Sequence, residues 1–236
     1  MGKSFQELDW RQTPLGELML RRRWDRTFEK DVFEIKLNDE FLMSSLFTVA
    51  EEEVARHALA ELSGTDFDVA VGGLGLGYTA LTVLEDPRVR SLAVIDALGE
   101  VIEWHEQGLI PAGTTLTADP RCTLVHGDFF AMVRDPKESP LDQKFDAIIV
   151  DIDHSPRHLL HPSNADFYEP EGIARLADLL RPGGVFGLWS NDPPDTEYVA
   201  ALEQSFTNVK AEIVKFANPL QEREATATVY VATTAK

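Results

Sequence analysis

The chain has 236 residues, 44% of them hydrophobic and 26% charged, and its formal net charge at pH 7 is −18. This surplus of carboxylates excludes a nucleic-acid backbone as partner, because such binding depends on lysine and arginine neutralising phosphates. The length suits one good-sized core, and no apolar run approaches the roughly 18 residues of a membrane span, which argues against a membrane partner.

The first predicted elements are short strands. Alternating patterns predict strands at 17–23, 32–37 and 40–44, which together form a small β cap over residues 1–47. The basic run Arg21–Arg23 is interpreted as a solvated edge of that cap. Thr48 and Glu51 match a capping box, which starts a helix that ends before Gly64. A second domain, residues 48–236, begins at this helix.

Strands and helices then alternate to the end of the chain. Buried-strand patterns lie at 67–73, 92–96, 122–126, 145–151 and 185–190, and a closing pair of strands lies at 209–216 and 226–233. Helices are predicted at 78–84, 100–107, 129–132, 173–180 and 198–206, the fourth stopped by the run at 181–184. The pattern predicts an α/β fold: a doubly wound, mostly parallel seven-stranded sheet with a small N-terminal β cap.

A glycine-rich turn follows the first strand of this sheet. Gly73, Gly75 and Gly77 allow the backbone to approach a ligand, and Asp96 ends the next strand, where a carboxylate can bind ribose hydroxyls. The dinucleotide fingerprint requires its third glycine at the position of Tyr78, so the spacing disfavours NAD and FAD. It resembles the turn of class I S-adenosylmethionine (AdoMet) transferases, and we assign the three glycines and Asp96 to an adenosyl cofactor.

The carboxyl ends of the later strands are also acidic or polar. Asp128 is placed to accept the adenine amino proton while Phe129 or Phe130 covers the ring. Asp151 ends the following strand, and the next one ends in residues 190–192, Ser-Asn-Asp. Ligands bind outside the carboxyl ends of strands in such sheets, so we expect the chemistry among these residues.

Five segments together resemble the spermidine synthase (polyamine aminopropyltransferase) family. They lie in order at residues 71–77, 119–128, 145–151, 167–168 and 180–185. The resemblance implies the sheet of the AdoMet-dependent methyltransferases. It also implies that Asp96 binds ribose, that Asp128 binds adenine and that Asp151 accepts a proton from the attacking amine.

Three positions depart from the family pattern. The family's glycine loop carries an aspartate at the position of Leu76 or, in the alternative alignment, of Leu74. Residues 151–154 read Asp-Ile-Asp-His in place of Asp-Ser-Ser-Asp, and residues 43–45 read Met-Ser-Ser in place of Tyr-His-Glu. In the family these groups hold the diamine and the charged end of the propylamine. The resemblance therefore supports the cofactor type better than the substrate.

We assign the catalytic base to Asp151, because an amine nucleophile is protonated at neutral pH and must lose a proton. Asp153 is expected to assist it. His154, Trp189 and Asn191 are expected to contact the substrate. A zinc site at His154, His158 and His161, or a magnesium site at Asp151 with Asn191–Asp192, is the less favoured interpretation, and we expect no metal.

Three functions remain open. The first is AdoMet-dependent methyl transfer to a small molecule, the second is aminopropyl transfer from decarboxylated AdoMet to a polyamine, and the third is non-catalytic binding of an adenosyl ligand. We favour the first, because the cofactor residues persist while the diamine-holding groups do not. The acidic charge excludes partners rather than naming one, so a cationic amine as the small-molecule acceptor and a homodimer are both left open.

The single cysteine, Cys122, cannot pair within the chain, and residues 1–7 lack the apolar core of a signal peptide. We therefore expect a cytoplasmic protein.

Overall fold

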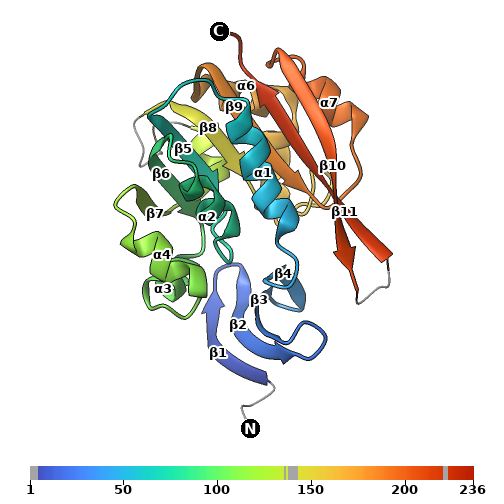
Figure 1. Cartoon of the computed structure of the whole chain (residues 1–236). Coiled ribbons are helices and arrows are strands. Elements are labelled where there is room, and N and C mark those ends of the chain that lie inside the picture. Colours follow the sequence, from blue (N-terminus) through green and yellow to red (C-terminus); the bar gives the residue numbers. More distant parts are fainter. Residues whose placement is uncertain (1–4, 136, 138–142, 220–222) are drawn as a thin grey trace.

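Two β-sheets organise the chain: a four-stranded antiparallel sheet at the N-terminus and a seven-stranded mixed sheet after it (Figure 1). This computed structural model describes residues 5–135, 137, 143–219 and 223–236. The predicted α/β class, the mostly parallel seven-stranded sheet and the N-terminal β cap are confirmed.

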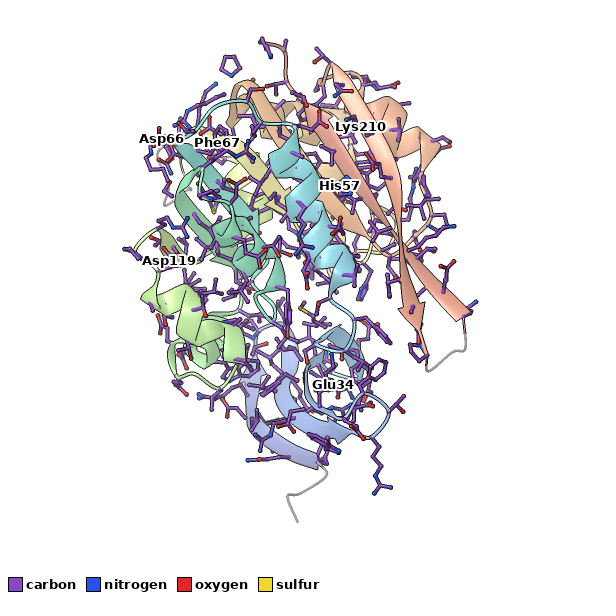
Figure 2. The ribbon with its side chains drawn as sticks, viewed as in Figure 1. Glu34, His57, Asp66, Phe67, Asp119 and Lys210 are labelled. Atoms are coloured by element: carbon purple, nitrogen blue, oxygen red, sulfur yellow. The ribbon has the colours of Figure 1, made fainter. Side chains whose placement is uncertain are left out.

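The cap has one strand more than the sequence predicted. Its strands follow chain order: β1 (Phe5–Thr13), β2 (Gly16–Asp25), β3 (Lys30–Leu37) and β4 (Glu40–Ser44). β1 was missed because most of its side chains are polar, with no apolar alternation to mark a buried face. Since β2 lies between β1 and β3, the interpretation of Arg21–Arg23 as a solvated edge is wrong. The Nε atoms of Arg21 and Arg23 lie 2.6 and 2.9 Å from the carboxylate of Glu34, which Figure 2 shows within the cap.

The large sheet has the spatial order β10-β11-β9-β8-β5-β6-β7. Its strands are β5 (Phe67–Gly72), β6 (Val89–Asp96), β7 (Cys122–His126), β8 (Phe145–Val150), β9 (Leu180–Ser190), β10 (Asn208–Asn218) and β11 (Arg223–Thr233). β5 to β9 are parallel, whereas β11 runs antiparallel to both β9 and β10. The chain moves from β5 outward to β7 and then returns to β8 on the other side of β5. The order therefore reverses between β5 and β8, where such sheets bind ligands.

Helices cover both faces of this sheet (Figure 1). One face carries α1 (Val49–Ala60), α2 (Tyr78–Glu85), α3 (Gly99–Glu106) and α4 (Pro111–Ala118), and the other carries α5 (Phe129–Arg134), the 3-10 helix η2 (Pro162–Tyr168), α6 (Pro170–Asp178) and α7 (Thr196–Leu202). Adjacent strand residues alternate between the two cores: Val69 and Val71 belong to the first, and Ala70 belongs to the second. β5 is buried on both sides, which explains its apolar run Val69–Val71.

One expectation about these elements is wrong, and one helix was missed. The run Arg181–Gly184 does not end a helix but lies within β9, and α6 stops earlier, at Asp178. Helix α4 was not predicted, because it is short and rich in small residues and threonine. Gly113 allows α4 to pack against α3: a Cβ atom there would lie 2.2 Å from the backbone oxygen of His105.

The cap packs against the large sheet. Leu18, Leu20 and Ile35 belong to the same core as the helices of the first face, and Trp104 on α3 donates its indole N–H to Asp9 of β1 at 2.7 Å. No helix among the described residues is long and apolar enough to cross a membrane.

Candidate active site

A cavity of about 860 Å³, the main cavity, lies at the carboxyl ends of β5, β6 and β8. Its far wall comes from the cap, through residues of the turn between β3 and β4. A volume of this size suits a drug-sized ligand. Most of the site residues predicted from sequence line it: Gly73, Gly75, Asp96, Asp128, Phe129, Asp151, His154 and Trp189.

The three glycines after β5 differ in what a side chain would meet. Gly73 has φ +96°, and a Cβ atom there would lie 2.2 Å from the backbone oxygen of Asp151. Gly75, with φ +46°, also lines the main cavity. Gly77 differs from both: a Cβ atom there would meet His105 at 2.9 Å, and the residue does not line the cavity. The assignment of Gly77 to the cofactor is therefore corrected to packing of α2.

Asp96 holds the glycine loop in place. Its carboxylate oxygens accept hydrogen bonds from the backbone N–H groups of Leu74 and Leu98, both at 2.8 Å. Burial raises the pKa of Asp96, and these hydrogen bonds oppose that rise. A carboxylate can accept about four hydrogen bonds, so Asp96 retains capacity for the hydroxyls of a ribose.

Asp128 and Phe129 form the adjacent wall. Asp128 is exposed and begins α5, where its Oδ1 accepts a hydrogen bond from the N–H of Ala131 at 3.1 Å. Phe129 is buried against β5, since a Cβ atom on Gly72 would lie 2.8 Å from its ring. An exposed hydrogen-bond acceptor beside an aromatic side chain fits an adenine ring.

Asp151 follows β8 directly and lines the main cavity. It accepts a hydrogen bond from the hydroxyl of Thr79 at 2.9 Å, and burial raises its pKa to about 6. Glu51, in the first turn of α1, lines the same cavity. Burial and the nearby charge of Asp151 raise the pKa of Glu51 to about 8. At neutral pH the pair therefore holds about one proton and one negative charge.

The sequence missed the part that Glu51 plays in this site. The predicted capping box is wrong, because the Thr48 hydroxyl donates to the side chain of Glu52 at 2.8 Å and caps no backbone N–H. The only feature of the sequence that points to this role of Glu51 is the run of three glutamates, Glu51–Glu53. Successive residues of a helix point about 100° apart, so three glutamates within one turn point in three directions, and one of them is directed toward the sheet.

Asp153 does not have the catalytic position that the sequence predicted. It is 1% exposed and does not line the main cavity. Its carboxylate accepts hydrogen bonds from the Leu160 N–H at 2.7 Å, the Asn164 amide at 3.0 Å and the Tyr168 hydroxyl at 2.9 Å. We therefore assign Asp153 to positioning the segment 153–168, part of which lines the cavity.

The three predicted substrate residues do not all meet. His154 and Trp189 line the main cavity, but Asn191 lines a second cavity of about 480 Å³ beside it. The two cavities share Glu51 and Trp189. Trp189 also has a buried indole N–H that finds no hydrogen-bond partner among the described residues.

The alternative metal sites are not assembled. No group of three or more histidine, cysteine, aspartate or glutamate side chains could hold a metal ion in the described part of the chain. Asp192 lies against the Ser155 hydroxyl at 2.6 Å and against Nδ1 of His158 at 2.8 Å.

The charge of the main cavity is strongly one-sided. Among the described residues that line it, six are carboxylates and none is lysine or arginine. The carboxylates are Asp39, Glu40, Glu51, Asp96, Asp128 and Asp151. A cavity of this kind attracts cationic ligands and disfavours a ligand with a carboxylate of its own.

Comparisons with known proteins agree with this geometry. A family model described as the spermine/spermidine synthase domain matches residues 50–234. Polyamine aminopropyltransferase 2 of Pseudomonas aeruginosa is 30% identical over 153 residues, which is 60% of this chain and 40% of the relative. The match with this chain thus spans less than half of that relative's length.

Two solved structures share the fold. Spermidine synthase from Thermotoga maritima aligns with a TM-score of 0.73 and 17% identity, over 97% of this chain and 72% of that chain. A spermidine synthase in complex with the transition-state analogue AdoDATO aligns with a TM-score of 0.72, at the same identity and coverage. The fold implied by the sequence resemblance is confirmed.

Proposed function

The chain belongs to the spermine/spermidine synthase family, and we propose that it transfers an aminopropyl group from decarboxylated AdoMet to an amine. The charge of the main cavity carries this proposal, because its lining combines six acidic residues with no lysine or arginine among the described residues. Decarboxylated AdoMet and an amine are both cationic, whereas AdoMet brings a carboxylate. The sequence favoured methyl transfer. The family match favours its stated alternative, and methyl transfer is not retained.

The donor would occupy the end of the cavity at β5 and β6. Gly73 and Gly75 leave room beside the backbone, Asp96 would accept from ribose hydroxyls, and Asp128 with Phe129 would hold the adenine. When bound, the donor supplies a carbon activated by a positively charged sulfur. These side chains hold that carbon in line with the acceptor, and positioning of this kind supplies much of the rate enhancement.

The acceptor would lie at the other end, against Asp151. An alkyl amine with a pKa near that of lysine, about 10.4, is protonated at neutral pH and cannot attack until it loses a proton. Asp151, with a pKa of about 6, is mostly ionised at pH 7 and can take that proton. His154 and Trp189 line the same end of the cavity and would contact the acceptor chain.

A binding and turnover experiment tests the proposal. Calorimetry on the purified protein compares decarboxylated AdoMet, AdoMet, methylthioadenosine and NAD, and turnover with putrescine, spermidine and other amines is followed by release of methylthioadenosine. We expect decarboxylated AdoMet to bind at least 10-fold more tightly than AdoMet and to give turnover with an amine. Tighter binding of AdoMet together with methylated products, or binding of NAD alone, would overturn it.

A further inference from the structure

Glu51 differs from Asp151 in one structural respect: it lines two cavities. Asp151 lines only the main cavity, whereas Glu51 also lines the second cavity, together with Phe47, Ala50 and Asn191. The hydroxyl of Thr79 lies between the two acidic residues, 2.9 Å from Oδ2 of Asp151 and 3.3 Å from the backbone oxygen of Glu51. Glu51 therefore borders both the cavity that contains the base and the second cavity.

The proposed reaction creates a need for such a group. The acceptor enters as an ammonium ion, its nitrogen forms a bond to the donor carbon, and the carbon–sulfur bond breaks with its electron pair remaining on sulfur. The acceptor ammonium and the donor sulfonium, which each carry one positive charge, become one secondary ammonium and one neutral thioether. Each turnover therefore releases one proton. That proton first resides on Asp151, which the bound donor and acceptor would cover, and it must leave before the next turnover.

We propose that Glu51 receives the proton from Asp151 and passes it to solvent through the second cavity. This inference rests on the proposed aminopropyl transfer and deepens it. Glu51 is suited to the step because it lines the main cavity together with Asp151, whose charge acts on it, and also lines the second cavity. Asp151 does not line the second cavity.

The charges around Glu51 support proton sharing between the two acids. Asp151 faces it from the end of β8, Tyr78 from α2 and Glu52 from its own helix, and Arg223 and Glu224 belong to the second cavity. Asp151 is the neighbour whose charge most raises the pKa of Glu51, after burial itself. Such pairs lose their protons in two coupled steps, the first near pH 6 and the second near pH 8.

Two measurements test the inference, one without turnover and one with it. In the empty protein, carboxyl ¹³C NMR should resolve two linked titration steps. Glu51→Gln should remove the upper step and leave the lower one near pH 6. Asp151 loses its proton in the lower step, and residue 51 is uncharged at that point in both proteins, as a protonated glutamate in wild type and as a glutamine in the variant. Asp151→Asn should instead lower the remaining step below about pH 8. An upper step that stays near pH 8 in Asp151→Asn would show that the two acids titrate independently and would overturn the pairing.

In the turnover assay, Glu51→Gln should lower kcat about 10- to 100-fold while the affinity for decarboxylated AdoMet stays within about 3-fold of wild type. Glu51→Asp, which keeps the carboxyl, should recover part of that loss, and thermal unfolding checks that both variants fold. Glu53→Gln is the matched control: Glu53 lies in the same helix and pairs with Arg56, outside both cavities.

The two measurements separate the possible failures. A protein with linked titrations but no turnover with any amine would contradict the proposed function and leave the acid pair intact. A Glu51→Gln variant with wild-type kcat and an unchanged pH profile would overturn the proton route while aminopropyl transfer stood.

Discussion

The two ends of the main cavity are built in different ways. The half that we propose for the donor, the adenosyl half, consists of Gly73, Gly75, Asp96, Asp128 and Phe129, which lie at or just after the ends of three neighbouring parallel strands. The half that we propose for the amine, the acceptor half, consists of Glu51, Asp151, His154 and Trp189, which come from α1, from the residues after β8 and from β9. Short local sequence motifs specify the adenosyl half. The acceptor half forms only when α1, which precedes the large sheet in the chain, packs against the ends of the sheet's strands.

Two aspartates near β8 show the same contrast at close range. Asp151 faces the main cavity with one side-chain donor, Thr79, whereas Asp153 is buried under three donors from the segment that follows it. Both carboxyls have raised pKa values because of burial. What separates a base from a positioning group is therefore access to the ligand, since a carboxylate surrounded by protein donors has no substrate proton to take.

Loss of the base should have the largest effect. Asp151→Asn keeps the shape of the side chain but cannot accept a proton, so we expect kcat to fall about 10²- to 10⁴-fold. The affinity for decarboxylated AdoMet should stay within about 3-fold, because the donor is held by the other half. Steady-state kinetics with calorimetry measures both. Equal losses in donor binding and turnover would contradict the division into two halves.

The next largest effect should come from the adenosyl half. Asp96→Ala removes the acceptor of the Leu74 and Leu98 N–H groups and of the proposed ribose hydroxyls, and we expect donor affinity to fall about 10- to 100-fold. Asp96→Asn, which keeps one acceptor oxygen, is the matched variant and should lose less. Calorimetry with methylthioadenosine measures the nucleoside part alone. An unchanged affinity in Asp96→Ala would remove Asp96 from the donor site.

Asp153 provides the test of a positioning role. Asp153→Asn should lower the free energy of unfolding by about 1–3 kcal/mol, because buried donors lose a charged acceptor. Its activity should fall less than that of Asp151→Asn, and the acid limb of its pH profile should stay where it is in wild type. Urea unfolding and a pH profile of kcat measure these. Asp178→Asn, at an exposed carboxyl, is the control. A shift of the acid limb in Asp153→Asn would restore Asp153 as a titrating catalytic group.

The smallest expected effect concerns stability and pH. The folded-state pKa values of Glu51 and Asp151, about 8 and about 6, lie above the ordinary values of 4.5 and 3.8. At pH values between the ordinary and the folded-state pKa values, the folded protein binds more protons than the unfolded chain. The free energy of unfolding therefore falls as pH rises from about 4 to 8. The loss should be on the order of 1–3 kcal/mol after discounting for solvent access to the cavity. The double variant Glu51→Gln, Asp151→Asn should flatten this slope in urea unfolding measured from pH 5 to 9.

The elements that the sequence predicted correctly are those with a strong pattern. β5, β6 and β8 each contain an apolar run because both faces of the sheet are covered, and their order along the chain implied a parallel arrangement. β1 and α4 carry no such pattern. β1 is held mainly by pairing with β2, and α4 by a close approach to α3 that depends on Gly113. Contacts of that kind cannot be detected in the periodicity of a single segment.

The sequence by itself determined where the chain can approach a nucleoside and which acids end the strands beside it. Glycine turns and strand-end carboxylates are local, because a parallel sheet brings the carboxyl ends of its strands to one edge in any register. Only the tertiary structure decided which carboxyls face the main cavity: it turned Asp153 and Gly77 away from the ligand and brought Glu51 to Asp151. The reason is that the side chain of a helix residue reaches a site only through the docking of the whole helix, which depends on residues throughout the chain.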